Sequence, residues 1–549
     1  MIKTSIKALR LFMQSTPTQS VGVAAVIIAT AGMASRLLGL VRDRILATQF
    51  GAGNEIDIYA AAFRLPDLMF DLLVLGALSA AFIPVFTCLR ESGKMEEAWK
   101  MTSGVLTVLV TVLAGVGVLL WFFAPTILPL FVPGFDESKI AQTVSLTRVM
   151  LLGPIFLSVS AVFGGVLVSV KKFTLYALAP VLYNTGIIIG AVWFVDEMGI
   201  IGLAWGVVFG AILHILIQTP AVASVGFRYI PQKVHSIFSD IHLRRVIRLM
   251  LPRMFGTASN QISWIVITFF ASTLATGSLA VFTFANNIQS VPLGLIGIPF
   301  AVAVFPTLAT LMAHKKNQEF ERVVIKEFRR ILFLVLPISV LLILLRAQVV
   351  RVILGAGAFD WEDTILTFTV LGILAVSLFA QSTIPLLARS FYAMEDTKTP
   401  FFIALFAQFI NIILVIVLVD RWQIVGIAIA FSVATTVNMT GLLLFLHRRL
   451  KVRAQWSRIG LAIGKIIVAT AGAACATQIG KIITGTHVEL DTFLAVFYQL
   501  LFAGLLGVGT YIILSYLLHI DEFFSLRKEV LKRVFRRSAQ ASEEISETH

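Results

Sequence analysis

The stretch GAGNEIDIYAAAFRLP (residues 51–66) is matched further along the chain by GSLAVFTFANNIQSVP (residues 277–292). The two stretches have the same length, begin with glycine and end with proline. Two more pairs recur at almost the same spacing: KKFTLYALAPVLYN (171–184) with KTPFFIALFAQFIN (398–411), and IIGLAWG (200–206) with IVGIAIA (424–430). Three matches at nearly one offset predict that the chain contains two copies of one structural unit.

The composition places these copies in a membrane. Of the 549 residues, 58% are hydrophobic and only 13% are charged, whereas a soluble protein has about one quarter charged residues. Apolar runs of about 18 residues or more recur along the chain, which predicts an all-α polytopic membrane protein with about 14 spans. No long loop offers room for a soluble catalytic domain, so we do not expect an enzyme. The predicted spans cover residues 20–48, 55–88, 101–131, 142–170, 174–195, 199–225, 247–275, 278–312, 327–347, 364–393, 400–419, 424–446, 459–483 and 493–519.

The repeat then predicts the organisation of the spans. Matching stretches lie six spans apart, so each half has an even number of spans and both halves have the same orientation, as in transporters with two lobes around a central site. We therefore expect a first lobe at 1–235 and a second at 236–450. Spans 13 and 14 lie at 451–520, and a cytoplasmic amphipathic and disordered tail lies at 521–549.

The net charge of +14 is explained by the loops. Basic loops such as HLRRVIR and LHRRLKVRAQWSR alternate with short neutral or acidic ones such as GAGNEID and FDWEDT. Basic loops belong in the cytoplasm, which places both termini there and makes membrane lipids, rather than nucleic acid, the expected partners. The last residues before the disordered end suit a helix on an anionic leaflet.

Charged residues inside two spans are the candidate functional site. In span 2, Asp57, Arg64, Asp67 and Asp71 share one stripe, within about 80° of Asp57 on a helical wheel. In span 1, Arg36 and Asp43 share a face, and Arg42 lies about 100° round from Asp43. Charges in a span must face a water-filled cavity or ionic partners.

Two interpretations of these charges remain open. In one, Arg36, Arg42 and Arg64 bind a phosphate-like group, because guanidinium forks match phosphate oxygens. In the other, Arg64 pairs with Asp67 or Asp71, and Arg36 pairs with Asp43, only to hold helices together. The matching spans of the second half carry amides and almost no charge, at Asn260, Gln261, Asn286, Asn287 and Gln289.

No sequence pattern indicates a cofactor. The two cysteines and eight histidines have no metal-ligand or redox spacing. No Walker A motif occurs, so we do not expect ATP to drive the protein. Energy would come from the membrane potential or from an ion gradient, and no residue spacing specifies a coupling ion.

Several stretches together resemble the MurJ (MviN) family of the multidrug/oligosaccharidyl-lipid/polysaccharide (MOP) exporter superfamily. They are SRLLGLVRDRILATQFGAGNEIDIYAAAFRLPDL (35–68), GALSAAFIPVF (76–86), VPLGLIGIPFAVAVFPTLA (291–309) and LARSFYAMEDTKTP (387–400). The resemblance implies a MATE-like V shape and a flippase for lipid II, the undecaprenyl-pyrophosphate-linked peptidoglycan precursor. It would move lipid II from the inner to the outer leaflet of the bacterial inner membrane by alternating access. Spans 13 and 14 would form a groove for the lipid tail, and the cell-wall synthesis machinery is an expected partner.

The resemblance also carries over to particular residues. Arg36, Arg42, Asp43 and Asp57 stand where the family has functionally important cavity residues, and Arg64 stands where members have a basic residue. The family's ADR motif reads ANN here, at residues 285–287, and Phe70 and Asp71 lie where an arginine is common. We therefore predict substrate binding by Arg36, Arg42, Arg64, Asn286 and Asn287, oriented by Asp43, Asp57, Asp67 and Asp71. The alternative functions are a MOP-type exporter of another lipid-linked oligosaccharide or of drugs, and a membrane scaffold that transports nothing.

Overall fold

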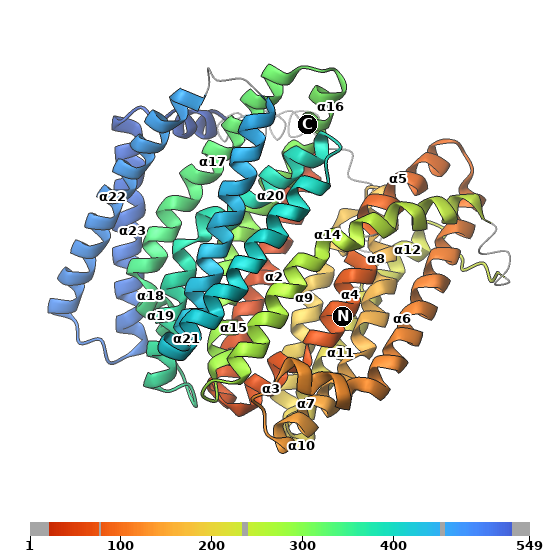
Figure 1. Ribbon diagram of the computed structural model, residues 1–549, viewed down its shortest axis with the longest axis horizontal. Coiled ribbons are helices and arrows are strands. Elements are labelled where there is room, and N and C mark those ends of the chain that lie inside the picture. The colour runs from red at the N-terminus through yellow and green to blue at the C-terminus, as the bar shows by residue number, and fades with distance from the viewer. Residues whose placement is uncertain (1–20, 76–77, 233–239, 451–455, 530–549) are drawn as a thin grey trace, which may run out of the picture. The chain divides into compact units, whose positions relative to one another are not determined.

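A computed structural model of the chain describes residues 21–75, 78–232, 240–450 and 456–529. This described part consists of α-helices and three short π-helical turns, without a strand (Figure 1). The first elements are α2 (Val21–Phe50), α3 (Asn54–Ala62), α4 (Arg64–Phe70), η1 (Asp71–Leu75), α5 (Leu78–Glu91), α6 (Met95–Phe131), α7 (Glu137–Met150), α8 (Leu152–Ser169), α9 (Phe173–Ile189), η2 (Gly190–Phe194), α10 (Val195–Met198), α11 (Ile201–Leu216) and α12 (Thr219–Ser224). The others are α14 (Ile241–Ser272), α15 (Ser278–Pro292), η3 (Leu293–Gly297), α16 (Ile298–Ala313), α17 (Asn317–Leu344), α18 (Arg346–Ile353), α19 (Trp361–Val376), α20 (Leu378–Ala393), α21 (Lys398–Leu450), α22 (Trp456–His487) and α23 (Phe493–Leu517).

The helices agree with the predicted spans. Each predicted span falls on one helix or on a run of consecutive helices. Within the described residues, eight helices are long and apolar enough to cross a membrane, or up to ten if each of two bent helix pairs is one span. The all-α multi-pass fold is thus confirmed, and the number of 14 spans stays a prediction.

The internal repeat is visible in the local structure of the two matching segments. After α4 the chain widens into the π-helical turn η1, and α5 follows with Pro84 inside it. After α15 the chain widens in the same way into η3, and α16 follows with Pro306 inside it. Turns of this kind are rare and are frequent at functional sites, so their recurrence at matching positions supports the repeat.

Helix α21 contains two of the predicted spans. Gln423 has a φ of 46° and a ψ of −131°, which interrupts the helix and divides it into two arms. The predicted spans 400–419 and 424–446 lie on these arms. The gap between the two predicted spans thus coincides with the break at Gln423.

The described helices form two compact units, each with its own core. The first contains Met1–Ile288, Ile353–Thr367 and Gln408–Ala430, and the second contains Gln289–Val352, Phe368–Ala407 and Phe431–His549. In the first unit, Phe82, Phe86 and Trp99 are buried in one apolar cluster. In the second, Phe320 and Phe391 are buried in another. The lobe boundaries at 235 and 450 follow from the sequence repeat and stay a prediction.

Small residues position α9, the helix that carries part of the candidate site. Helix α9 packs against both α2 and α11 in the first unit. At the contact with α11, a Cβ on Gly186 would overlap the backbone of Gly210, so only glycine allows this approach. Small residues at helix interfaces let backbones pack closely in membranes. The result is a fixed frame for the polar residues of α9 that face α2.

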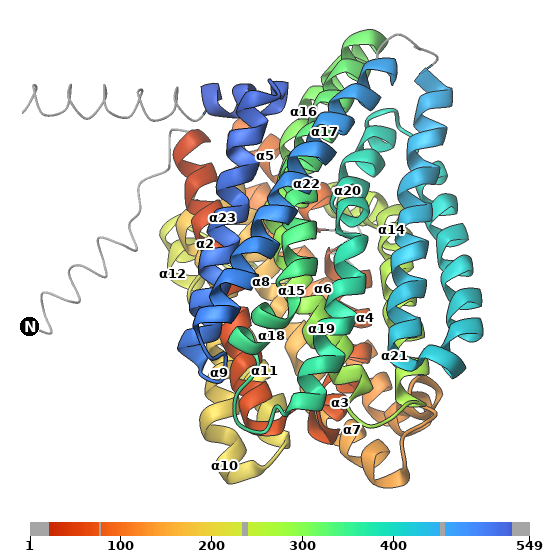
Figure 2. The same ribbon diagram turned by 90° about the vertical axis from the view of Figure 1, so that its left-hand side faces the viewer.

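The C-terminal segment of the second unit is held by ion pairs. Helices α22 and α23 lie side by side in both views (Figures 1 and 2). Residues 521–529 then form a further helical segment, in which Glu522 lies 2.5 Å from Arg329 and Glu529 lies 2.6 Å from Arg330, both on α17. The first part of the predicted tail is thus anchored to α17, and residues 530–549 lie outside the described residues.

Candidate functional site

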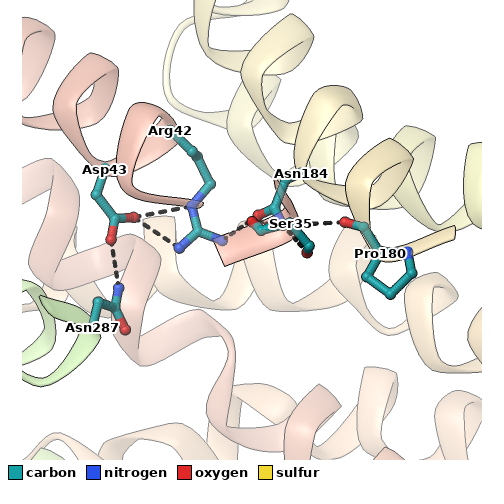
Figure 3. A network of polar contacts seen from close by, with 6 residues as sticks. All are labelled: Ser35, Arg42, Asp43, Pro180, Asn184 and Asn287. Carbon is teal, nitrogen blue, oxygen red and sulfur yellow. Dashed lines mark hydrogen bonds and ion pairs between the residues drawn. The ribbon is translucent and has the colours of Figure 1, made fainter. Parts of the chain in front are cut away.

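Arg42 on α2 lies at the centre of a polar network in the first unit (Figure 3). Its Nε and Nη2 donate to Oδ1 of Asp43 at 3.0 and 2.7 Å, and its Nη1 donates to Oδ1 of Asn184 on α9 at 3.1 Å. Asn184 in turn donates to the carbonyl oxygen of Pro180 and to the hydroxyl of Ser35. The guanidinium is therefore held in one orientation by groups from two helices.

The network leaves Arg42 able to bind a further acceptor. A guanidinium has five N–H groups, and the three hydrogen bonds to Asp43 and Asn184 leave one N–H on each Nη atom. The Arg42 side chain is 22% exposed, whereas that of Asp43 is 3% exposed. Two N–H groups in a fork suit two oxygens of a phosphate. The arrangement can thus bind an oxyanion without breaking the ion pair.

Arg36 adds a second positive charge on the same helix. It lies six residues before Arg42, about 9 Å along the helix axis, and is partly buried. No carboxylate in the described part of the chain forms an ion pair with it. Asp43 neutralises Arg42, so residues 36–43 of α2 carry a net charge of +1, and Arg44 adds a further positive charge to the helix. The predicted pairing of Arg36 with Asp43 does not occur in this structure.

Asp43 connects this cluster to the second half of the sequence. Nδ2 of Asn287 on α15 donates to Oδ2 of Asp43 at 2.9 Å, so each carboxylate oxygen has its own partner. Asn286 and Asn287 are both partly buried. The structure therefore brings Asn287 together with Arg42 through Asp43, as the prediction of a shared site requires.

Asp57 lies on α3, away from this cluster, and its carboxylate contacts the N-terminus of α15. Its Oδ2 accepts from the backbone N–H of Gly277 at 2.7 Å, and its Oδ1 accepts from that of Ala280 at 2.9 Å. These amides have no partner within the helix, and a carboxylate there also interacts favourably with the helix dipole. A Cβ on Gly277, whose φ is +91°, would overlap the carbonyl oxygen of Ala52. Asp57 thus caps a helix of the other half at a tightly packed turn.

Two of the remaining residues of the stripe, Arg64 and Asp71, contact α14. The Arg64 guanidinium lies 4.6 Å from the centroid of the Trp264 ring, and its Nε donates to the carbonyl oxygen of Ala60 at 3.1 Å. Asp71 accepts a hydrogen bond from Nε2 of Gln261. Arg64 forms no ion pair with Asp67 or Asp71 in this structure, although Asp67 lies within electrostatic range of it. With 7% exposure, Arg64 is covered by the Trp264 ring in this state.

Three further residues complete the site; sequence reasoning had noted Gln261 as an amide of the second half without a role, and had missed Asn184 and Trp264. Asn184, Gln261 and Trp264 each bind one of the predicted charged side chains. A polar asparagine inside the apolar run of α9 was an available signal. The partners of a side chain on another helix, however, depend on packing that no sequence spacing reveals.

No metal site accompanies the cluster. Within the described ranges, no group of three or more His, Cys, Asp or Glu side chains is placed to hold a metal ion. The absence of a cofactor and the existence of a coupling ion both stay predictions.

The fold is that of a multi-pass α-helical membrane protein, and solved transporters share it. The fold is that of MATE transporters of the MOP superfamily. An inward-facing multidrug-resistance MATE structure matches with a TM-score of 0.64 and 16% identity, over 78% of this chain and 98% of that one. Within this class, the chain belongs to the lipid II flippase MurJ family, whose model matches residues 46–503.

Individual relatives agree with the family match. The probable lipid II flippase MurJ of Buchnera aphidicola subsp. Acyrthosiphon pisum is 30% identical over 446 residues, which cover 79% of this chain and 85% of that protein. The probable lipid II flippase MurJ of Bdellovibrio bacteriovorus is 29% identical, over 92% of this chain and 96% of that protein. A structure of lipid II flippase MurJ in an inward closed conformation matches with a TM-score of 0.73 and 25% identity, over 90% of this chain and 99% of that one.

Proposed function

We propose that this chain is a flippase that carries lipid II from the inner to the outer leaflet of the bacterial inner membrane by alternating access, and so supplies peptidoglycan synthesis. Membership of the MurJ family supports this function. The matches to two relatives of that name cover 85% and 96% of the length of the relative. We also expect both termini to be cytoplasmic, as the basic loops indicate.

The observation that carries the proposal is the net positive charge on α2, with free donors on Arg42. A lipid-linked pyrophosphate must leave the aqueous surface, and its charge is costly in a bilayer unless it is paired. Arg36 supplies an uncompensated cation, and the fork of Arg42 supplies two aligned N–H groups. Asn184 and Asp43 hold that fork before the substrate arrives, so little side-chain entropy is lost on binding.

The amides of the second half complete the proposed site. Asn286 and Asn287 donate hydrogen bonds but add no charge, so most of the electrostatic attraction comes from Arg36 and Arg42. Arg64 is the third cation, and it reaches the substrate only where the Trp264 ring moves aside. Asp67 and Asp71 then limit the net charge of this region.

We further propose that substrate binding weakens the contact between Asp43 and Asn287. A pyrophosphate bound to the free N–H groups of Arg42 shares the charge of that guanidinium with Asp43 and repels the Asp43 carboxylate. Asp43 is the group that links Arg42 to α15, so the substrate's charge acts on the contact between α2 and α15. Binding that favours one arrangement of two helices over another is what alternating access requires.

A reconstituted translocation assay tests this function. Purified full-length protein in liposomes should move lipid II to the opposite leaflet faster than undecaprenyl-linked lipids with other head groups. Arg42→Gln should slow this movement while the protein still inserts and folds. The function is wrong if lipid II does not cross, or if an unrelated lipid-linked oligosaccharide crosses instead.

A further inference from the structure

The second unit contains an apolar groove that the transport cluster does not use. Its volume is about 890 Å³, within the range of about 300–1,000 Å³ that is typical of ligand pockets. The groove lies between the two arms of α21 and reaches Val376 at the end of α19. Its lining includes Phe402, Phe406 and Phe445, whose side chains are half exposed or more. None of these residues lies on α2 or α15, the helices that carry the proposed pyrophosphate site.

The hydroxyl groups in the groove wall do not make it polar. Thr436 donates to the carbonyl oxygen of Ser432, and Thr440 donates to that of Thr436. Ser432 donates to the carbonyl oxygen of Ile373. Because these three hydroxyls are satisfied by backbone oxygens, this part of the groove presents methyl groups and aromatic rings. Such a wall suits a hydrocarbon chain rather than a sugar or an ion.

One end of the groove carries a free positive charge. Lys398, the first residue of α21, lines the groove together with Thr399. The Lys398 side chain is exposed and forms no ion pair with any described residue. The neighbouring carboxylate of Asp396 already pairs with Arg449 and accepts from the Thr399 hydroxyl. The charge at this end is therefore a lysine that is available to an external anion.

The length of the groove matches one leaflet. From Lys398 to Phe406, the first arm rises about 12 Å, at 1.5 Å for each residue. Half of a hydrocarbon core of about 30 Å is about 15 Å. The Lys398 end also carries the basic segment LHRRL at the end of α21, which places it on the inner face by the positive-inside rule. An occupant with its phosphate at Lys398 would keep its chains in the inner leaflet.

From these features we propose that the α21 groove binds an anionic phospholipid of the inner leaflet, with its phosphate at Lys398 and its acyl chains along the aromatic wall. The lipid would also contact Val376, next to Ser377, where α19 and α20 meet at a 43° bend. Ser377 is held there by Ser432 at 3.2 Å. The bound lipid would thereby stabilise this bent pair of helices. It is a resident lipid and not the transported one.

Defined nanodiscs test this proposal without the transport substrate. Full-length protein should unfold at a higher temperature with phosphatidylglycerol than with phosphatidylcholine alone, and native mass spectrometry should retain phosphatidylglycerol on it. Lys398→Gln and Val433→Trp should each remove most of this stabilisation and of the retained lipid. The first removes the cation, and the second fills the groove at a wall residue that is 41% exposed.

Two control variants separate groove binding from a general effect of the surface. Lys100→Gln removes an exposed lysine of α6, and Val112→Trp enlarges an α6 residue that is 42% exposed. Both should behave like the unchanged protein. The proposal is overturned if all four variants respond alike, or if phosphatidylglycerol gives no stabilisation. It is also overturned if protein purified from cells retains a polyprenyl lipid at the groove in place of phospholipid.

Discussion

The side-chain amide of Asn287 on α15 donates a 2.9 Å hydrogen bond to the carboxylate of Asp43 on α2. The same carboxylate pairs with Arg42 through its other oxygen. One acidic side chain thus both neutralises the arginine proposed to bind substrate and links it to a helix of the other sequence half. Asp43 therefore has two roles, as the counter-charge of Arg42 and as the acceptor for Asn287, and each can be tested by itself.

Asp43→Asn should destabilise the protein by about 1–3 kcal/mol, because the partly buried Arg42 loses a charged hydrogen-bond partner. The double change Arg42→Gln with Asp43→Asn should recover most of that stability, since no charge is then left unpaired. Neither variant should transport lipid II. Thermal unfolding and translocation measured on the same preparations check both statements. Full transport by the double variant would contradict the proposed role of Arg42.

Asn287→Arg should strengthen binding of the lipid II head group, by about tenfold. The new guanidinium would pair with Asp43, so that more N–H groups of Arg42 are available to the substrate. It would also add a positive charge, which forms strong hydrogen bonds with phosphate. Binding of a soluble lipid II analogue to the purified protein measures the effect. Asn287→Gln, which keeps an amide and adds no charge, is the matched control and should change binding little. An unchanged or weaker affinity of the arginine variant would argue against a pyrophosphate beside Asn287.

Asp57→Ala should lower the free energy of unfolding by about 1–2 kcal/mol, because two amides at the beginning of α15 lose their acceptor. Asp57→Asn keeps one oxygen acceptor and should have a smaller effect. Unfolding in detergent at matched lipid content gives the comparison. We expect head-group binding to persist in both variants, since Asp57 contacts Gly277 and Ala280 rather than Arg42. Loss of binding without loss of stability would instead place Asp57 in the substrate site.

Trp264→Leu should have opposite effects on stability and on binding. It removes the cation–π contact with Arg64, which contributes about 2 kcal/mol when it is desolvated. It also uncovers the guanidinium, so affinity for the lipid II head group should rise. Arg64→Met in the same background should abolish that rise. If Trp264→Leu leaves the affinity unchanged, Arg64 has a packing role only.

The sequence predicted the fold well because its signals are local or repetitive. Apolar runs located the helices, and three matched stretches indicated the repeat that the paired turns η1 and η3 support. Charges inside spans pointed to Arg42 and Asp43 because charge in a membrane segment is costly. The helical wheel did not predict the ion pairs. Arg36 and Asp43 share a face but do not pair, because Asp43 is adjacent to Arg42 and is bound by it.

The partners on other helices could not be predicted for a physical reason. Asn184 contacts Arg42 because α9 packs against α2, and a single sequence does not specify how two helices pack. Trp264 stacks on Arg64, but no sequence pattern links a tryptophan in the middle of the predicted span 247–275 with an arginine of the span 55–88. The α21 groove was also missed, since its wall consists of the same aromatic and aliphatic residues as any lipid-facing helix.

The central claim is that Arg36 and Arg42 bind the pyrophosphate of the substrate. Its most direct test is equilibrium binding of two undecaprenyl lipids that differ only in carrying a monophosphate or a pyrophosphate. The unchanged protein should prefer the pyrophosphate lipid, and Arg36→Gln and Arg42→Gln should each weaken its binding about 10- to 100-fold, as expected for a lost charged hydrogen bond. Monophosphate binding should fall less. Equal affinity for the two lipids, or unchanged pyrophosphate binding in both variants, would contradict the claim.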